Sequence, residues 1–199
     1  MKKIKSITFF LLVSIGVIIN AQNITVTSPD NNIAVTISNG EKLNYSVSFK
    51  GRGIINPSQL GFELKDEPAM TGNFAILNQS QNKFNEIWIP VVKSKHAKIE
   101  NNYNDLQLIL KEKSGPMRQI ELHVRAYNDG AAFRYKLFRA AKVGDRQIVK
   151  ELTTFNIPGD PKAWIVEYKG YASSNEAEFF EHPLSYLNEK SVAGMPMLM

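Results

Sequence analysis

The sequence contains no cysteine and few histidines, only 3 in 199 residues. The absence of cysteine excludes disulfides, a cysteine nucleophile and a metal site built on thiolates. His96, His123 and His182 lie far apart and lack metal-ligand spacing. Each is therefore interpreted as a surface or core histidine. A glycine-rich phosphate loop and a Gly-x-Ser-x-Gly motif are also missing, so nothing indicates nucleotide binding or a serine hydrolase.

Long apolar runs are scarce, and the one that is present lies at the N-terminus. Three lysines within the first five residues precede the mostly apolar residues 7–19, and Ala21 offers a small residue for cleavage. This order is typical of a secretory signal peptide, and the run is short for a membrane span. Residues 1–21 are predicted to be a signal peptide, which makes the mature chain periplasmic or secreted. The alternative is an uncleaved membrane anchor.

The positive charge is small once the leader is removed. The formal charge of +5 includes three lysines of the predicted signal peptide, so the mature chain carries about +2. Nucleic-acid binding needs a clustered basic patch, and the sequence shows none. We therefore expect neither a nucleic-acid partner nor membrane contact after signal cleavage.

Helical periodicity is absent before residue 170, and a period of two is present instead. Residues 33–38 and 43–49 alternate apolar and polar side chains around Asn39-Gly40, which predicts a hairpin. Turn-forming residues recur roughly every ten positions. Residues 22–199 are predicted to form one all-β domain, an antiparallel β-sandwich with a short irregular or helical C-terminal segment.

Three polar stretches are interpreted as breaks between strands. Residues 65–82 are expected to form a loop with an exposed turn at 78–82, and residues 101–104 a tight corner. Residues 140–145 are expected to form a polar link. Near the C-terminus, Ser173 and Glu176 have capping-box spacing, which favours a short helix over residues 175–181.

Asp129-Gly130 is predicted to be the two-residue turn of a central hairpin, in a type I′ conformation that needs positive φ at both positions. Ala126 then faces Phe133, and Val124 faces Tyr135, so that the apolar side chains share one face. The glycine should resist replacement by valine, because β-branched residues avoid positive φ.

The same register places like charges opposite each other on the outer face of the hairpin. Arg125 would face Arg134, and His123 would face Lys136, which is destabilising. Acidic groups from elsewhere in the chain, a partner domain or a ligand would relieve the repulsion. The alternative is a basic face whose charges are solvated.

Two residue types are candidates for sugar binding. Trp88 and Trp164 could stack on sugar rings, but tryptophans flanked by aliphatic residues are more often part of a core. Glu176, Glu178 and Glu181 could include a carboxylate pair of the kind that cleaves glycosides. The simpler interpretation of these three is a solvated polar stretch.

The sequence resembles the N-terminal β-sandwich domain of glycoside hydrolase family 97 from about residue 28 onward. The most specific part is Arg-Ala-Tyr-Asn-Asp-Gly-Ala-Ala-Phe-Arg-Tyr over residues 125–135, supported by Asn-Tyr-Asn-Asp-Leu over 102–106 and by residues 164–176. The resemblance implies a sandwich of the super-sandwich type. Family members are exported bacterial α-glucosidases and α-galactosidases that depend on calcium, and a catalytic (β/α)₈ barrel follows their sandwich.

The resemblance also implies what this chain does not contain. The family's catalytic carboxylates and a calcium-ligand glutamate lie beyond the matched region, so no catalytic residue and no metal ligand is assigned here, and the chain is expected to stop before the barrel. Residues 174–176 correspond to the family's Ser-Tyr-Glu segment, with Asn in place of Tyr. Glu176 and Tyr171 are the predicted substrate-binding residues.

The functional hypothesis is an accessory domain of an exported α-glycosidase. Its expected partners are the catalytic barrel and an α-linked oligosaccharide, and calcium is expected only in the full-length enzyme. The alternatives are a freestanding carbohydrate-binding module and a purely structural β-sandwich.

Overall fold

The computed structural model describes residues 22–138, 147–174 and 176–199. The predicted signal peptide and the predicted polar link at residues 140–145 lie outside the described residues. None of the helical segments in the described part has the length and hydropathy needed to span a bilayer.

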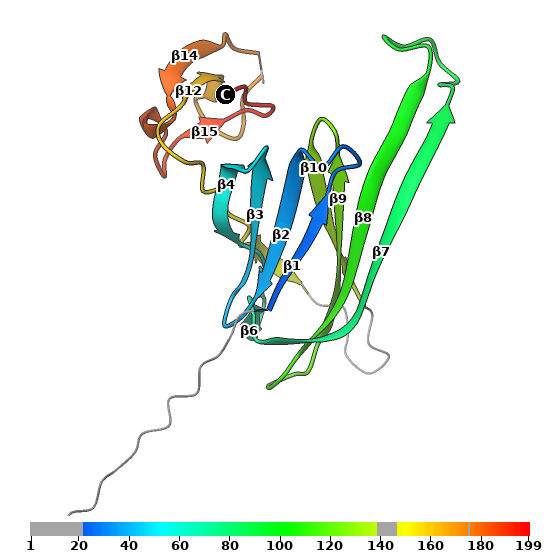
Figure 1. Cartoon of the computed structure of the whole chain (residues 1–199). Coiled ribbons are helices and arrows are strands. Elements are labelled where there is room, and N and C mark those ends of the chain that lie inside the picture. Colours follow the sequence, from blue (N-terminus) through cyan, green and yellow to red (C-terminus); the bar gives the residue numbers. More distant parts are fainter. Residues whose placement is uncertain (1–21, 139–146, 175) are drawn as a thin grey trace, which may run out of the picture.

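Two four-stranded sheets face each other, with strand orders β1-β2-β3-β4 and β10-β9-β8-β7, and every pairing is antiparallel (Figure 1). The all-β antiparallel sandwich predicted from the alternating pattern is confirmed. The strands of the first sheet are β1 (Gln22–Thr27), β2 (Ile33–Asn39), β3 (Leu43–Phe49) and β4 (Arg52–Gln59). Those of the second are β7 (Phe74–Trp88), β8 (Ile99–Glu112), β9 (Gln119–Tyr127) and β10 (Ala131–Leu137). A small third sheet, β11-β5-β6, consists of β5 (Phe62–Leu64), β6 (Glu67–Met70) and β11 (Ile148–Glu151).

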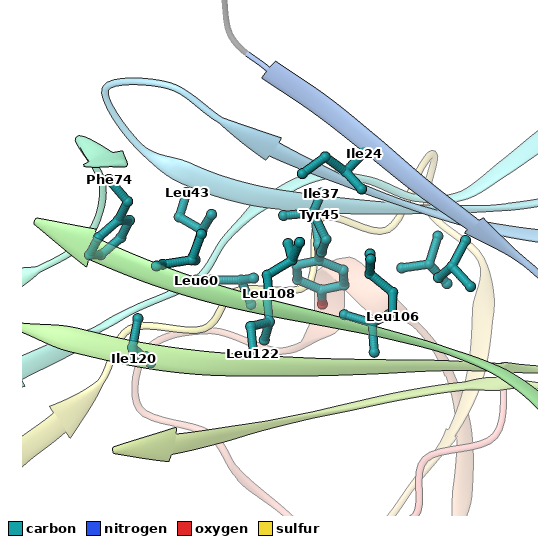
Figure 2. Close-up of a cluster of buried hydrophobic side chains, with 14 of the residues drawn as sticks. Ile24, Ile37, Leu43, Tyr45, Leu60, Phe74, Leu106, Leu108, Ile120 and Leu122 are labelled. Atoms are coloured by element: carbon teal, nitrogen blue, oxygen red, sulfur yellow. The ribbon is translucent and has the colours of Figure 1, made fainter. Parts of the chain in front are cut away.

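The core lies between the two large sheets, where one face of each strand is apolar (Figure 2). In β2 the burial alternates strictly, as expected when successive side chains point to opposite faces. Each fully buried aliphatic side chain contributes about 1.5–3 kcal/mol relative to an exposed one. The central rows of the second sheet are Leu106, Leu108 and Leu110 on β8 and Ile120, Leu122, Val124 and Ala126 on β9, all at most 2% exposed.

The β9–β10 hairpin forms where it was predicted, but its register differs by two residues. Val124 lies opposite Phe133, and the Tyr127 amide donates to the Gly130 carbonyl over 2.8 Å, so the turn is Asn128-Asp129. Asp129-Gly130 as the turn is wrong, and Gly130 does not have the positive φ expected of it. The shift leaves the apolar face unchanged, because side chains alternate with period two.

A tertiary hydrogen bond accounts for the shifted turn. The Asp30 amide donates to Asn128 Oδ1 over 3.0 Å, which joins the tip of the hairpin to the loop between β1 and β2. A local turn preference is thus overridden by a partner 98 residues away in sequence.

The shifted register also replaces the predicted like-charge pairs. Lys136 lies opposite Glu121, and their side chains are 3.0 Å apart, while His123 Nε2 lies 2.6 Å from the other Glu121 oxygen. Arg125 pairs with the buried Asp105 of β8 at 3.3 Å. Of the two alternatives, the acidic one holds for Arg125, His123 and Lys136, whose acidic partners belong to β8 and β9 of the same sheet, while Arg134 lies opposite His123.

The loop predicted at residues 65–82 and the corner at 101–104 are wrong. Residues 67–70 form β6, residues 78–82 lie within β7, and residues 101–104 lie within β8. Strand β7 pairs with β8 from Phe74 opposite Glu112 to Trp88 opposite Ile99. The backbone pairing outweighs local turn preference, and the polar side chains are tolerated because β7 is an edge strand.

The β7–β8 ribbon continues past the sandwich. Pairing of β8 with β9 ends at Tyr103 opposite Tyr127, whereas the pairing of β8 with β7 continues out to Ile99. Residues 84–103, named the arm from here on, form a two-stranded projection (Figure 1).

Arg118, in the turn between β8 and β9, ties this turn to β6. Its Nε donates to Glu112 Oε2 over 2.8 Å, its Nη1 to Glu67 Oε2 over 2.9 Å, and its Nη2 to the Pro68 carbonyl over 2.9 Å. The Arg118 side chain is only 1% exposed. A guanidinium suits this position because its planar fork binds a carboxylate through two parallel bonds.

Two glycines test the backbone interpretation. Gly61 has φ of +141°, and a Cβ there would lie 2.3 Å from the Met70 carbonyl oxygen, whereas a Cβ on Gly130 would meet open space. Gly61→Ala should lower the free energy of unfolding by at least about 2 kcal/mol, since strain and overpacking add. Gly130→Ala should change it by less than about 0.5 kcal/mol. Urea denaturation of both variants measures this, and equal effects would contradict the described backbone.

Removal of the Arg118 guanidinium should be far more costly than removal of an exposed cation. Arg118→Ala leaves the buried Glu112 carboxylate without its partner, so the free energy of unfolding should fall by about 3–5 kcal/mol. Lys162→Ala, which breaks the exposed pair with Glu181, is the control and should have little effect. Chemical denaturation of the two variants compares them, and an equally small effect of both would argue against the network.

Candidate functional site

The residues after Asn156 form a separate group of short strands, here called the C-terminal unit (residues 157–199). Strand β12 (Lys162–Ile165) pairs with β14 (Phe180–Pro183), and β13 (Glu167–Tyr168) pairs with β15 (Val192–Ala193). The Trp164 amide also donates to the Leu198 carbonyl over 2.8 Å. The unit lies beyond the end of the sandwich near the turn between β3 and β4 (Figure 1).

The helix predicted over residues 175–181 is wrong for the residues that the structure describes. Asn175 lies outside them, residues 176–179 have no regular structure, and residue 180 begins β14. Pairing with β12 provides the backbone partners that an isolated helical turn would lack. The capping-box spacing thus did not predict a helix correctly here.

A single 3₁₀ turn, η1 (Leu184–Tyr186), follows β14 and is held by Asp160. The amide and the hydroxyl of Ser185 donate to the two Asp160 oxygens, each over 2.8 Å. These hydrogen bonds, led by the one from the backbone, hold the pKa of Asp160 below its usual value. The turn orients Tyr186 toward β13.

A pocket of about 240 Å³ lies in this unit and combines aromatic rings with carboxylates. Strand β13 contributes Glu167, the segment before β14 contributes Glu178, and η1 contributes Tyr186. The remaining walls are Ile165, Ala177, Phe180 and His182. The pocket therefore draws on five segments: β12, β13, the residues before β14, β14 itself and η1.

The polar groups of the pocket are fixed relative to each other. The Tyr186 hydroxyl donates to Glu167 Oε2 over 3.1 Å, and the His182 ring stacks on the Tyr186 ring at 4.1 Å and 9°. The hydrogen bond to Glu167, reinforced by the charge of this carboxylate, raises the pKa of Tyr186. Both the phenol and the carboxylate are thus held in one arrangement.

Such an arrangement suits a sugar. Aromatic rings pack on the apolar C–H face of a pyranose, and carboxylates accept hydrogen bonds from its hydroxyl groups. The volume of the pocket fits one sugar ring rather than a chain of several sugar residues.

Neither predicted site residue lines this pocket. Tyr171 is 96% exposed in the bend between β13 and β14, and Glu176 is exposed immediately before Ala177 of the pocket wall. Sequence reasoning missed Glu167 and Tyr186, which meet only because β13 and η1 fold together. The clustering of aromatic residues in the C-terminal segment was the one available indication.

The two tryptophans are not core residues. Trp88 is 49% exposed on the arm and Trp164 is 47% exposed on β12. The core interpretation is therefore wrong for both. Each presents part of its ring to solvent, or to a partner.

Calcium would need six to eight oxygen ligands with several carboxylates converging. Within residues 22–138, 147–174 and 176–199, no three acidic or histidine side chains form a group that could hold a metal ion. The described residues therefore do not fit a calcium ion by themselves.

Comparison with known proteins gives a consistent set of relatives. The family model described as "Glycosyl-hydrolase 97 N-terminal" matches residues 26–199. A "Retaining alpha-galactosidase" of Bacteroides thetaiotaomicron is 28% identical over 211 aligned positions, which cover 98% of this chain and 30% of the relative. The chain thus spans less than a third of the length of that relative.

Solved structures show the same pattern. A glycoside hydrolase family 97 enzyme from Pseudoalteromonas sp. strain K8, solved in complex with panose, has a TM-score of 0.74 and 28% identity, covering 80% of this chain and 24% of that one. An enzyme of that family and strain in complex with acarbose gives the same values. A beta-arabinopyranosidase, at 22% identity and a TM-score of 0.68 over 80% of this chain and 26% of that one, shows the fold alone.

The Tyr186–Glu167 contact can be tested by titration. Because the folded pKa of Tyr186 lies above that of the unfolded chain, the contact stabilises the fold below about pH 10 and is lost as pH rises through the folded pKa. Glu167→Gln should lower the Tyr186 pKa toward its ordinary value. The ultraviolet absorbance of tyrosinate, corrected with Tyr186→Phe, measures this. Glu178→Gln is the control, and an unchanged titration in Glu167→Gln would contradict the contact.

Proposed function

The chain belongs to the glycosyl-hydrolase 97 N-terminal family, and we propose that it is the accessory domain of an exported α-glycosidase. The observation that carries this proposal is the family match over residues 26–199 together with relatives that are more than three times as long. In that setting the domain supports a catalytic portion, the (β/α)₈ barrel implied by the sequence resemblance, and contributes to sugar recognition.

The substrate of the full-length enzyme is an α-linked oligosaccharide. The support is the named activity of the Bacteroides relative and the panose and acarbose complexes of the Pseudoalteromonas enzymes. Hydrolysis needs two carboxyl groups at a defined separation across the anomeric carbon. We assign this pair, and the calcium ion, to the catalytic portion.

Sugar recognition by this domain is assigned to the C-terminal unit. The pocket carboxylate Glu167 and ring of Tyr186 bind one pyranose residue, and Tyr171 and Glu176 contact the substrate from the adjoining bend. The support is the combination of rings and carboxylates in one pocket, the position of Glu176 next to Ala177 of its wall, and the exposure of Tyr171. Export to the periplasm or the medium follows from the leader-like residues 1–21.

A freestanding carbohydrate-binding module is the second candidate. The half-exposed rings of Trp88 and Trp164 favour it, since exposed aromatic rings provide stacking surfaces for sugars. Binding of the isolated chain on a glycan array that is lost in Trp88→Ala or Trp164→Ala would support this function, and binding that depends instead on Glu167 and Tyr186 would favour the accessory domain.

Activity assays test the accessory role. Residues 22–199 alone should not hydrolyse chromogenic α-glucosides or α-galactosides. A chimera that joins them to the portion of the Bacteroides relative beyond the aligned region should hydrolyse one of these, and a chelator should abolish the activity.

The outcome that contradicts the proposal is equally concrete. Turnover by residues 22–199 alone, lost in Glu176→Gln, would make the chain a small glycosidase in its own right. Activity of the catalytic portion without any sandwich domain, at the rate of the chimera, would remove the accessory role.

A further inference from the structure

Three loops define one end of the sandwich, here called the hairpin end. They connect β1 to β2, β3 to β4 and β9 to β10. The Lys50 amide donates to the Asn32 carbonyl over 2.7 Å, and the Asp30 amide to Asn128 over 3.0 Å, so the three loops form one surface. Three apolar features lie at or beside this end.

The first feature is the arm, which extends past the hairpin end. From residue 83 to 98 every residue is exposed except Pro90. Ile87 and Ile89 are 61% and 71% exposed, and Val92 is 77% exposed. Ordering a chain costs about 1–2 kcal/mol per residue, and a two-stranded ribbon is marginal without packing. An ordered arm with an apolar surface therefore needs a partner surface.

The second feature is an apolar cleft of about 550 Å³ between the sheets at the hairpin end. Tyr45 and Phe133 of the core form part of its floor. Phe49, Ile54 and Phe155 line it and are 42–59% exposed. The hydrophobic core thus opens to the surface here, which marks an interaction site.

The third feature is the C-terminal unit itself. The segment that leads into it runs beside β4 toward the hairpin end, with the Thr154 amide bonded to Gln59 and the Asn56 amide bonded to Asn156. Tyr171, Phe179 and Met195 of the unit are at least half exposed. Figure 1 shows the unit on one side of the hairpin end and the arm on the other, with the strands whose residues line the cleft between them.

We propose that the arm, the cleft and the C-terminal unit form one cradle that grips the catalytic portion, with the arm as its distal clamp. This inference rests on the proposed function and adds the surface by which it acts. Intramolecular domain interfaces bury about 600–1,500 Å². The arm and the C-terminal unit would contact a globular partner from two sides, and the cleft would contact it from below. Contacts on three sides restrain the rotation of the partner, whereas a single flat contact would restrain it less.

The position of residue 199 favours this occupant. Leu198 is bridged to Trp164, so residue 199 lies in the C-terminal unit, at one side of the cradle. The family match runs to residue 199, and the relatives are far longer than the matched region. The polypeptide that follows this position in a full-length enzyme therefore starts at the cradle.

Charge at the tip of the arm argues against a second copy of this chain. Residues 89–98 include Lys93, Lys95 and Lys98 and no acidic residue. Symmetric pairing of two such tips would oppose like charges, which costs affinity. The clamp instead requires an acidic rim around an apolar patch on the catalytic portion.

Hydrogen exchange of the chimera and of residues 22–199 alone tests the cradle. The amides of the arm should exchange at least about tenfold more slowly in the chimera. The double variant Ile89→Ser with Val92→Ser should remove this protection. The matched control, Ile148→Ser with Val149→Ser, changes an isoleucine and a valine on β11 at the opposite end that are 48% and 62% exposed, and it should leave the protection intact.

The results separate the two proposals. An active, chelator-sensitive chimera whose arm exchanges as fast as that of the isolated chain overturns the cradle and leaves the accessory function standing. A chimera without activity in which the arm is protected overturns the function and keeps the interface. Dimerisation of the isolated chain that the arm variant abolishes, or arm-dependent binding to phosphatidylglycerol vesicles, assigns the arm to another partner and overturns the cradle.

Discussion

The structure depends on the burial of one apolar face of β8 and β9 beneath β1, β2 and β3. The leucines of β8 and the facing aliphatic rows of the first sheet are almost completely removed from water. Side chains alternate along a strand, so this burial sets the face that each strand presents. This burial also limits the region over which the two sheets contact each other. Apolar surface outside that region is left without a partner in the sandwich.

The candidate functional surfaces are the places where this mutual burial ends. The arm is the part of the β7–β8 ribbon beyond the last pair with β9, and the apolar cleft is the region where the sheets diverge at the hairpin end. The C-terminal unit is tied to the sandwich by the segment that runs along β4. A domain built to stand alone would cover such surfaces, whereas one built to hold a partner leaves them apolar and exposed.

Polar interactions join particular turns and strands within this packing of the two sheets. Arg118 fastens β6 to the turn between β8 and β9, and Glu121 and Asp105 pair with His123, Lys136 and Arg125. Asn128 selects the tip of the central hairpin by accepting a hydrogen bond from the Asp30 amide. None of these partners is adjacent in sequence, which is why the predicted Asp129-Gly130 turn and the loop at residues 65–82 were wrong. The local preference was real in each case, but the energy of a backbone ladder or a tertiary hydrogen bond exceeded it.

The sequence by itself determined the all-β class, the antiparallel sandwich, the apolar face of the central hairpin and the family. Alternation with period two encodes the fold class and the apolar face directly, and a shift of two residues does not alter them, whereas the family was indicated by the resemblance of residues 125–135. The tertiary structure alone decided the register of the hairpin, the length of the arm, the exposure of Trp88 and Trp164, and the meeting of Glu167 with Tyr186. These features depend on contacts between segments that are distant in sequence, and no local pattern specifies which distant partner a strand or side chain will find.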